Sequence, residues 1–90
     1  MKETQYEKIL KYFKHHKTIT PMEAFLHLGI TKLATRISEM KRAGYLFAQN
    51  MIEVENRDGA KVKVMQYKLV GRIHDDRFVP ANEIFERLAA

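Results

Sequence analysis

Several polar side chains between residues 31 and 43 recur at the spacing of one helix face. A helix that carries cations, a hydroxyl and a carboxylate on one face fits the major groove of B-DNA and can reach base edges there. A charged face that contacts only water has the same pattern. The surrounding elements must therefore decide between a DNA-binding face and a solvated one. The side chains in question are Lys32, Thr35, Arg36, Glu39 and Arg42.

Each of these side chains has its own capacity for hydrogen bonding. Arg36, in the middle of the stretch, can donate two parallel bonds to a guanine, and Lys32 can reach a base or a phosphate. Thr35 offers a hydroxyl and a methyl group, which suits a contact with thymine. Glu39 can accept from a cytosine amino group, or it can pair with Arg36 or Arg42 on its own helix.

A second group of cations follows in a predicted β-hairpin. Arg57 lies at its tip, where it can contact an adjacent minor groove or phosphates. Lys61 and Lys63 lie behind the tip and can also contact DNA. The expected strand register places Glu55 and Glu53 opposite them, so ion pairing within the hairpin is the alternative. Arg57 is therefore the strongest candidate in this segment.

Other chemistries lack the spacing that they require. His15, His16, His27 and His74 include no pair four positions apart on one helix, so no metal site is predicted. Ser38 is not part of a nucleophile elbow, and no glycine-rich phosphate loop is present. We therefore expect a protein that is not an enzyme, with no cofactor, metal or small-molecule substrate.

The composition is that of one small globular domain with a basic body. The chain has 90 residues, 46% hydrophobic and 30% charged, with a formal net charge of +5 and no cysteine. Residues 72–90 hold three arginines and four acidic residues, so the positive charge lies in residues 1–71. A basic body fits a nucleic-acid partner, or it serves solubility alone. No stretch is apolar enough for a membrane, and we expect a protein of the bacterial host cytoplasm.

The clearest local signal begins the second of three predicted helices. Thr20 and Glu23 can form a capping box around Pro21, which fits the first helical position, and Gly29 ends the helix. An earlier capping box at Thr4 begins the first helix, which is expected to end near residues 15–16. The expected apolar side of the second helix is Met22, Ala24, Phe25 and Leu28.

The third helix is expected to follow after a very short turn. Thr31 can cap it, or can bond a phosphate, and Gly44 ends it. Two helices joined by so short a turn must cross at a steep angle, which is the helix-turn-helix arrangement. The expected buried stripe of the third helix is Ile30, Leu33, Ile37 and Met40.

After Gly44 the hydrophobic period changes from 3.6 to 2, which predicts a β-hairpin closed by residues 57–59. The favoured register pairs Val54 with Val62 and Ile52 with Val64. The same register makes the hairpin base apolar on both faces, where a bulge or a second contact surface is expected. Residues 18–20 are β-prone and predict a short strand after the first helix.

The segment ITPMEAFLHLGITKLATRISEMKRAGY, followed by VENRDGAKVKVMQYKL, resembles a phage-associated family of small winged helix-turn-helix domains. The resemblance covers roughly residues 5–69 and is most specific at Ile-Thr-Pro-x-Glu-Ala, at Leu-Gly-Ile, at residues 36–40 and at the Asn-Arg-x-Gly turn. It implies DNA binding and a viral or prophage origin, without a particular operator. Ala24 and Gly29 lie five positions apart, one more than in the tightest helix-turn-helix pattern.

The expected fold is α+β, mainly α: a winged helix-turn-helix with a three-helix core, a short strand after the first helix, a two-stranded wing and a C-terminal helix. The winged domain is assigned to residues 1–71. Residues 72–90 are assigned to a linker followed by a short C-terminal helix. The linker is expected over about residues 71–79, and the helix is expected to begin at Pro80. This helix either packs on the domain or mediates a homodimer through Ile84, Phe85 and Leu88.

Two functions are compatible with this interpretation. The first is binding of double-stranded DNA by a small phage or prophage transcriptional regulator, with helix 31–43 in the major groove and wing 52–64 on the adjacent minor groove or backbone. The alternative is a protein-interaction module in a replication, packaging or host-directed complex. RNA binding is less favoured, because the chain lacks the aromatic sheet platform of single-strand readers.

Overall fold

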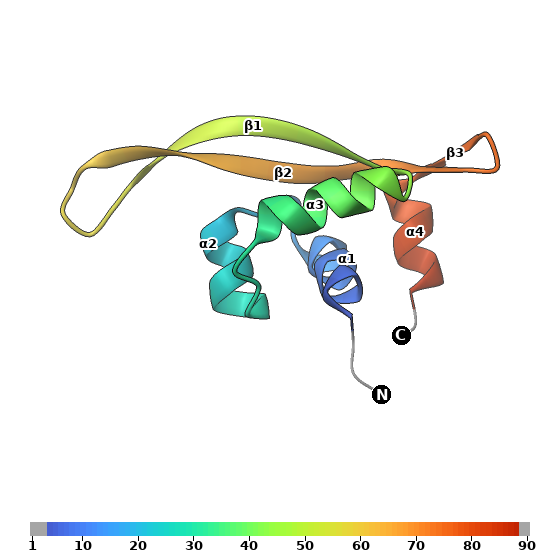
Figure 1. The fold of residues 1–90 in the computed structure, drawn as a ribbon, viewed down its shortest axis with the longest axis horizontal. Coiled ribbons are helices and arrows are strands. Elements are labelled where there is room, and N and C mark those ends of the chain that lie inside the picture. Colours follow the sequence, from blue (N-terminus) through green and yellow to red (C-terminus); the bar gives the residue numbers. More distant parts are fainter. Residues whose placement is uncertain (1–3, 89–90) are drawn as a thin grey trace.

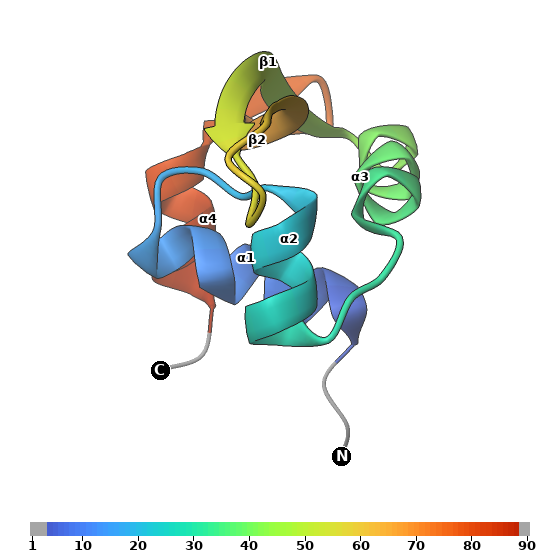
Figure 2. The same cartoon turned by 90° about the vertical axis from the view of Figure 1, so that its left-hand side faces the viewer.

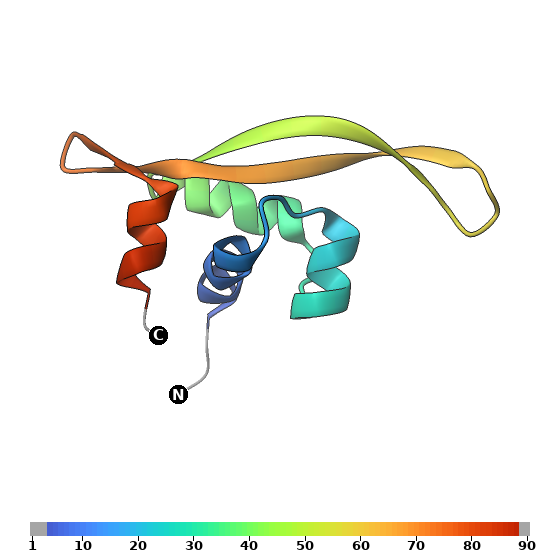
Figure 3. The same cartoon turned by 180° about the vertical axis from the view of Figure 1, so that it is seen from behind.

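A computed structural model describes residues 4–88 and shows helices gathered on one face of a three-stranded antiparallel sheet (Figures 1 and 3). The fold is α+β, and its sheet has the strand order β1-β2-β3 where two strands were expected. The elements are α1 (Gln5–His15), α2 (Pro21–Glu23), the π-helical turn η1 (Ala24–Leu28), α3 (Leu33–Arg42), β1 (Tyr45–Glu55), β2 (Lys61–His74), β3 (Arg77–Pro80) and α4 (Ala81–Arg87).

Both predicted capping boxes are confirmed. The Thr4 side chain accepts from the backbone amide of Glu7, and the Thr20 side chain accepts from that of Glu23, each with the reciprocal bond in place. Pro21 occupies the first turn of α2, where its missing N–H costs nothing. These local bonds determine where α1 and α2 begin, because each satisfies two backbone donors that the helix leaves free.

The extra residue between Ala24 and Gly29 is absorbed by a π-helical turn. Residues 24–28 form η1, and Gly29 follows in the left-handed conformation, with φ of 69°. The backbone amide of Ile30 reaches back to the carbonyl of Ala24 at 3.1 Å. A π-turn accommodates one more residue than an α-turn, so the short connection to α3 survives the longer spacing.

The predicted apolar side of the second helix is wrong. Only Ala24 is buried and Leu28 is half-buried, whereas Met22 is 63% and Phe25 54% exposed. At about 100° per residue, Met22 lies almost opposite the buried Ala24 and Phe25 lies about a quarter-turn from it, so the expected residues do not share one helix face. These apolar side chains, together with Leu26, therefore lie on the surface of the molecule.

The core stripe of α3 is confirmed, but its predicted cap is wrong. Leu33, Ile37 and Met40 are buried as expected, and Ile30 joins them just before the helix. Thr31 lies outside the helix, whose N-cap is Lys32 with no side-chain hydrogen bond. The π-turn places the chain so that α3 begins two residues after Thr31, too late for its hydroxyl to cap the first turn.

The predicted register of the wing is confirmed along its whole length. Val54 pairs with Val62, Ile52 with Val64, and Phe47 with Leu69. The register shifts between Leu46 and Phe47, which is the irregularity expected at the hairpin base. Ile19 makes the predicted short strand as a single antiparallel bridge to Tyr67, and this bridge joins the chain after α1 to the sheet.

The expected linker is wrong, because β2 continues to His74 and turns back as β3. The turn consists of Asp75 and Asp76, both with positive φ (50° and 62°), the geometry of the tight hairpin turns that favour asparagine and glycine. Neither residue is a glycine, so the local sequence signal for a hairpin was weak.

Helix α4 closes the core beside α1 and β2. Ile84 is only 8% exposed, and Phe85 and Leu88 are half-buried against the same cluster. The side chains that were expected to mediate a homodimer thus pack against the core of their own chain. This agrees with the other expectation, in which the helix packs on the domain. Figure 2 shows the resulting arrangement, with α3 and α4 on opposite flanks of α1 below the sheet.

Candidate nucleic-acid interface

The free face of α3 is centred on Thr35, Ser38 and Arg42. Each residue of an α-helix advances by about 100° around its axis, so these three lie opposite the buried stripe, and all three are exposed. Lys32 is exposed at the beginning of the helix. Sequence analysis did not include Ser38 among the contact residues, although its position opposite Leu33, Ile37 and Met40 followed from the stripe itself.

Arg36 lies at the edge of this face and is bound to its neighbour. Its Nη1 is 3.1 Å from Glu39 Oε1, and the two side chains are 31% and 35% exposed. Of the alternatives open for Glu39, the structure shows the ion pair with Arg36. The residue expected to read guanine therefore already has an intramolecular partner.

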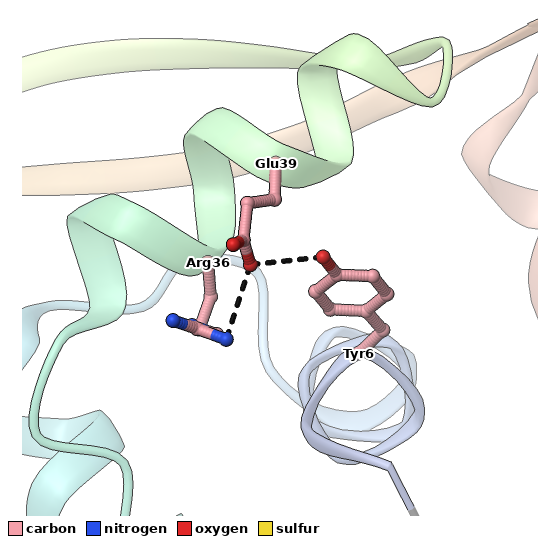
Figure 4. Close-up of polar contacts among 3 residues, drawn as sticks. All are labelled: Tyr6, Arg36 and Glu39. Atoms are coloured by element: carbon pink, nitrogen blue, oxygen red, sulfur yellow. Dashed lines mark hydrogen bonds and ion pairs between the residues drawn. The ribbon is translucent and has the colours of Figure 1, made fainter.

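Tyr6 of α1 completes this arrangement. Its hydroxyl donates to the same Glu39 Oε1 at 2.9 Å, so that the carboxylate joins α1 to α3 (Figure 4). The hydrogen bond to Glu39 raises the pKa of Tyr6 above its ordinary value of 10.0, because the bond is lost when the phenol ionises. The Tyr6–Glu39–Arg36 chain fixes the side of α3 that borders α1.

On the opposite side of α3, Lys41 hydrogen-bonds to Gln49 of β1 through its Nζ. This bond links the last turn of the helix to the sheet. Arg42, the next residue, makes no ion pair with any part of the chain that the structure describes. The helix is thus held at both edges by polar contacts, while Thr35, Ser38 and Arg42 between them stay available to a partner.

The wing projects beyond the N-terminal end of α3 and extends past α2 (Figure 1). At its tip, the Asn56 side chain accepts from the backbone amides of Asp58 and Ala60, each at 3.0 Å, and Gly59 adopts φ of 81°. These bonds hold a defined turn that carries Arg57 into solvent. The tip therefore carries an exposed cation beyond the N-terminal end of α3 (Figure 1).

Behind the tip, Lys61 and Lys63 lie opposite Glu55 and Glu53, as predicted. All four side chains are exposed, and neither lysine forms an ion pair within residues 4–88. The facing glutamates reduce the positive electrostatic potential around the two lysines, but the lysine side chains stay exposed and available to an external partner. The structure brings Lys32, Thr35 and Arg42 together on one helix and leaves the wing cations as a separate group.

The comparisons with known proteins agree with this geometry. Residues 4–72 match the family model of the winged helix-turn-helix domain, and the chain belongs to that family. Members of this family are typically DNA-binding and generally non-enzymatic. Neither the curated proteins nor the solved structures gave a match. Among residues 4–88, no helix has the length and apolar character needed to cross a bilayer.

Proposed function

We propose that this protein binds double-stranded DNA sequence-specifically and acts as a small phage or prophage transcriptional regulator in the bacterial host cytoplasm. Helix α3 enters the major groove, and the wing lies on the adjacent minor groove or the backbone. The observation that carries the proposal is the exposed face of Thr35, Ser38 and Arg42 on a helix of a winged helix-turn-helix domain.

The contacts divide into reading and positioning roles. Arg42 and Thr35 face away from the core and are assigned to base edges, with Ser38 beside them. Lys32, the N-cap of α3, and Thr31, which precedes it, are assigned to phosphates. Their assignment fits the general pattern in which phosphate contacts set the register of a protein on the duplex.

Arg36 and Glu39 are assigned to the border of the interface. Their ion pair orients the Arg36 guanidinium, whose exposed part can reach a phosphate beside α1. In the wing, Arg57 is assigned to the minor groove or backbone, with Lys61 and Lys63 adding electrostatic attraction. A wing contact of this kind increases affinity more than it determines sequence.

Selection from a random duplex pool tests this proposal. The wild-type protein should enrich a defined sequence, and Arg42→Ala should relax the preference at one position at a cost of about 1–3 kcal/mol. Arg77→Ala, at the first residue of β3, is the matched control and should enrich the same sequence as the wild type. Enrichment of no sequence by the wild type would contradict the proposed reading role.

One observation favours the alternative function as a protein-interaction module in a replication, packaging or host-directed complex. Met22, Phe25 and Leu26 form an exposed apolar surface on α2 and η1, with 63%, 54% and 66% of each residue accessible. Beside it, a groove of about 570 Å³ separates Met22 from the apolar face of the wing, which includes Val54 and Val62. Exposed apolar surface of this kind is typical of protein contact sites.

Site-directed photo-crosslinking in the host cell separates the two functions. A crosslinker at position 42 should capture DNA if α3 reads the duplex. A crosslinker at position 26 should capture one protein in stoichiometric yield if the apolar surface of α2 and η1 is the functional site. Capture of protein at position 26 together with no DNA at position 42 would favour the alternative.

A further inference from the structure

A second cationic surface lies away from α3, in a groove between the end of α1, β2 and α4. We call it the flank groove; its volume is about 370 Å³. Its lining includes three lysines and two histidines, and no carboxylate. Phe13 and Leu69 are among the apolar residues that line it, along which long lysine stems can pack. The basic residues are Lys14, His15, His16, Lys17 and Lys68.

The cations of the flank groove come from three separate segments. Lys14 belongs to the last turn of α1, Lys17 to the loop that follows, and Lys68 to β2. A cation at the C-terminal end of a helix is stabilised by the helix dipole, which accounts for the position of Lys14. It does not account for Lys68, which the sheet brings to the same place from far along the chain.

The charge of these lysines is not neutralised within the fold. In the wing, Lys61 and Lys63 each face a glutamate across the strands, whereas Lys68 faces Ala48. Within residues 4–88, none of Lys14, Lys17 and Lys68 forms an ion pair. The groove therefore concentrates positive charge that only an external anion can neutralise.

The position of the flank groove separates it from the DNA site assigned to α3. Figure 2 shows α3 and α4 on opposite flanks, and Figure 3 shows α1 and α4 in front of α3. No residue of α3 lines the groove. The helical layer of the domain lies between the two surfaces, so the flank groove and the exposed face of α3 point in different directions (Figures 2 and 3).

We infer that the flank groove binds the phosphate backbone of a second DNA duplex, so that one copy of the protein bridges two DNA segments. The lysines act as point charges toward phosphates and release condensed counterions, with no reading of sequence. The bridging rests on the proposed function, because α3 must hold the first duplex. The contact between the flank groove and the second duplex does not depend on α3.

A capture assay with the full chain tests bridging. An immobilised duplex is incubated with protein and a second, fluorescent duplex, and the captured fluorescence is measured. The wild type should capture the second duplex. A variant with Lys14→Gln, Lys17→Gln and Lys68→Gln should lose capture by roughly tenfold or more and keep its affinity for a single specific duplex within about threefold. Lys8→Gln, Arg77→Gln and Arg87→Gln remove the same charge elsewhere and form the matched control.

A second variant separates this inference from the proposed function. With Thr35→Ala and Arg42→Ala, sequence preference should disappear, while salt-dependent duplex binding through the phosphate contacts remains. Adding the three lysine substitutions to this variant should reduce the magnitude of its salt slope by about 2.7, the value for three phosphate contacts. Equal capture by the wild type and the lysine variant would overturn the inference, as would single-duplex binding by the wild type without capture. If the α3 substitutions change nothing and the lysine substitutions abolish all duplex binding, the proposed reading role fails and the groove contact stands.

Discussion

The Tyr6 hydroxyl donates a 2.9 Å hydrogen bond to Glu39 Oε1, the same atom that pairs with Arg36 at 3.1 Å. One carboxylate thus joins α1 to α3 and holds the cation expected to read DNA. The contact holds Arg36 and Glu39 at the edge of the helix, which is why the proposed function assigns the bases to Arg42 and Thr35. Several measurable consequences derive from this and from neighbouring contacts.

The substitution Tyr6→Phe removes the bond between α1 and α3 and should lower the melting temperature. It should also change the response to alkali. The raised pKa of Tyr6 means that its stabilising contribution is complete below the ordinary value of 10.0 and is lost as the pH rises through the folded-state value. The wild type should therefore lose more stability than Tyr6→Phe between neutral and strongly alkaline pH in urea unfolding.

Burial also raises the pKa of Tyr12 and of Tyr67. Some alkaline destabilisation should therefore remain in the Tyr6→Phe variant. Identical pH profiles for the variant and the wild type would show that the Tyr6–Glu39 bond does not form in solution.

Because α3 begins without a side-chain cap, a substitution that caps it should raise the stability of the protein and weaken its binding to a duplex. Lys32 is the N-cap and makes no capping bond, and its charge opposes the helix dipole. Lys32→Asn should raise the free energy of unfolding by about 1 kcal/mol, since asparagine is a preferred N-cap. The same change should weaken duplex binding and reduce its salt slope by about 1. A variant with improved binding would contradict the phosphate role of Lys32.

The turn between β2 and β3 offers a test of backbone strain. Asp76 has φ of 62°, a conformation that glycine adopts without steric cost. Asp76→Gly should stabilise the protein by roughly 0.5–1 kcal/mol in urea unfolding, because relief of about 1–2 kcal/mol of left-handed strain exceeds the entropy cost of glycine. Asp58→Gly, in the wing turn, is the control and should give no such gain, because Asp58 does not have a positive φ.

Helix α4 is predicted to be part of the folding unit. Ile84 is 8% exposed and packs on the core cluster, so Ile84→Ala should cost roughly 2–5 kcal/mol. The exposed neighbour Asn82 provides the control, as Asn82→Ala should change stability little. If Ile84→Ala alters the mass in solution but not the stability, the helix serves self-association instead.

Local rules were enough to predict the parts of the fold that depend on neighbours in sequence. The capping boxes at Thr4 and Thr20, the stop at Gly29 and the register of Val54 with Val62 are set by hydrogen bonds and side-chain pairs within short segments. The core stripe of α3 was predictable for the same reason, since its spacing alone defines the buried face.

The features that sequence analysis missed depend on long-range contacts or on rare backbone states. The π-turn η1 accommodates the extra residue before Gly29, and β3 exists because β2 pairs with it across an unusual Asp75–Asp76 turn. The direction of Arg36 depends on Glu39 and Tyr6, and Tyr6 is 33 positions away from Glu39. Sequence patterns could place these residues on elements but could not show which of them meet.

The most direct test of the central claim is a titration of a labelled duplex pool at two salt concentrations with the wild type, Arg42→Ala and Arg36→Ala. The account predicts that wild-type affinity falls roughly a hundredfold between about 50 and 200 mM salt, as for four phosphate contacts. Arg42→Ala should relax the preference at one base position, at a cost of about 1–3 kcal/mol, while Arg36→Ala should keep the wild-type preference. Absence of duplex binding by the wild type at the lower salt concentration would contradict the claim that α3 reads DNA.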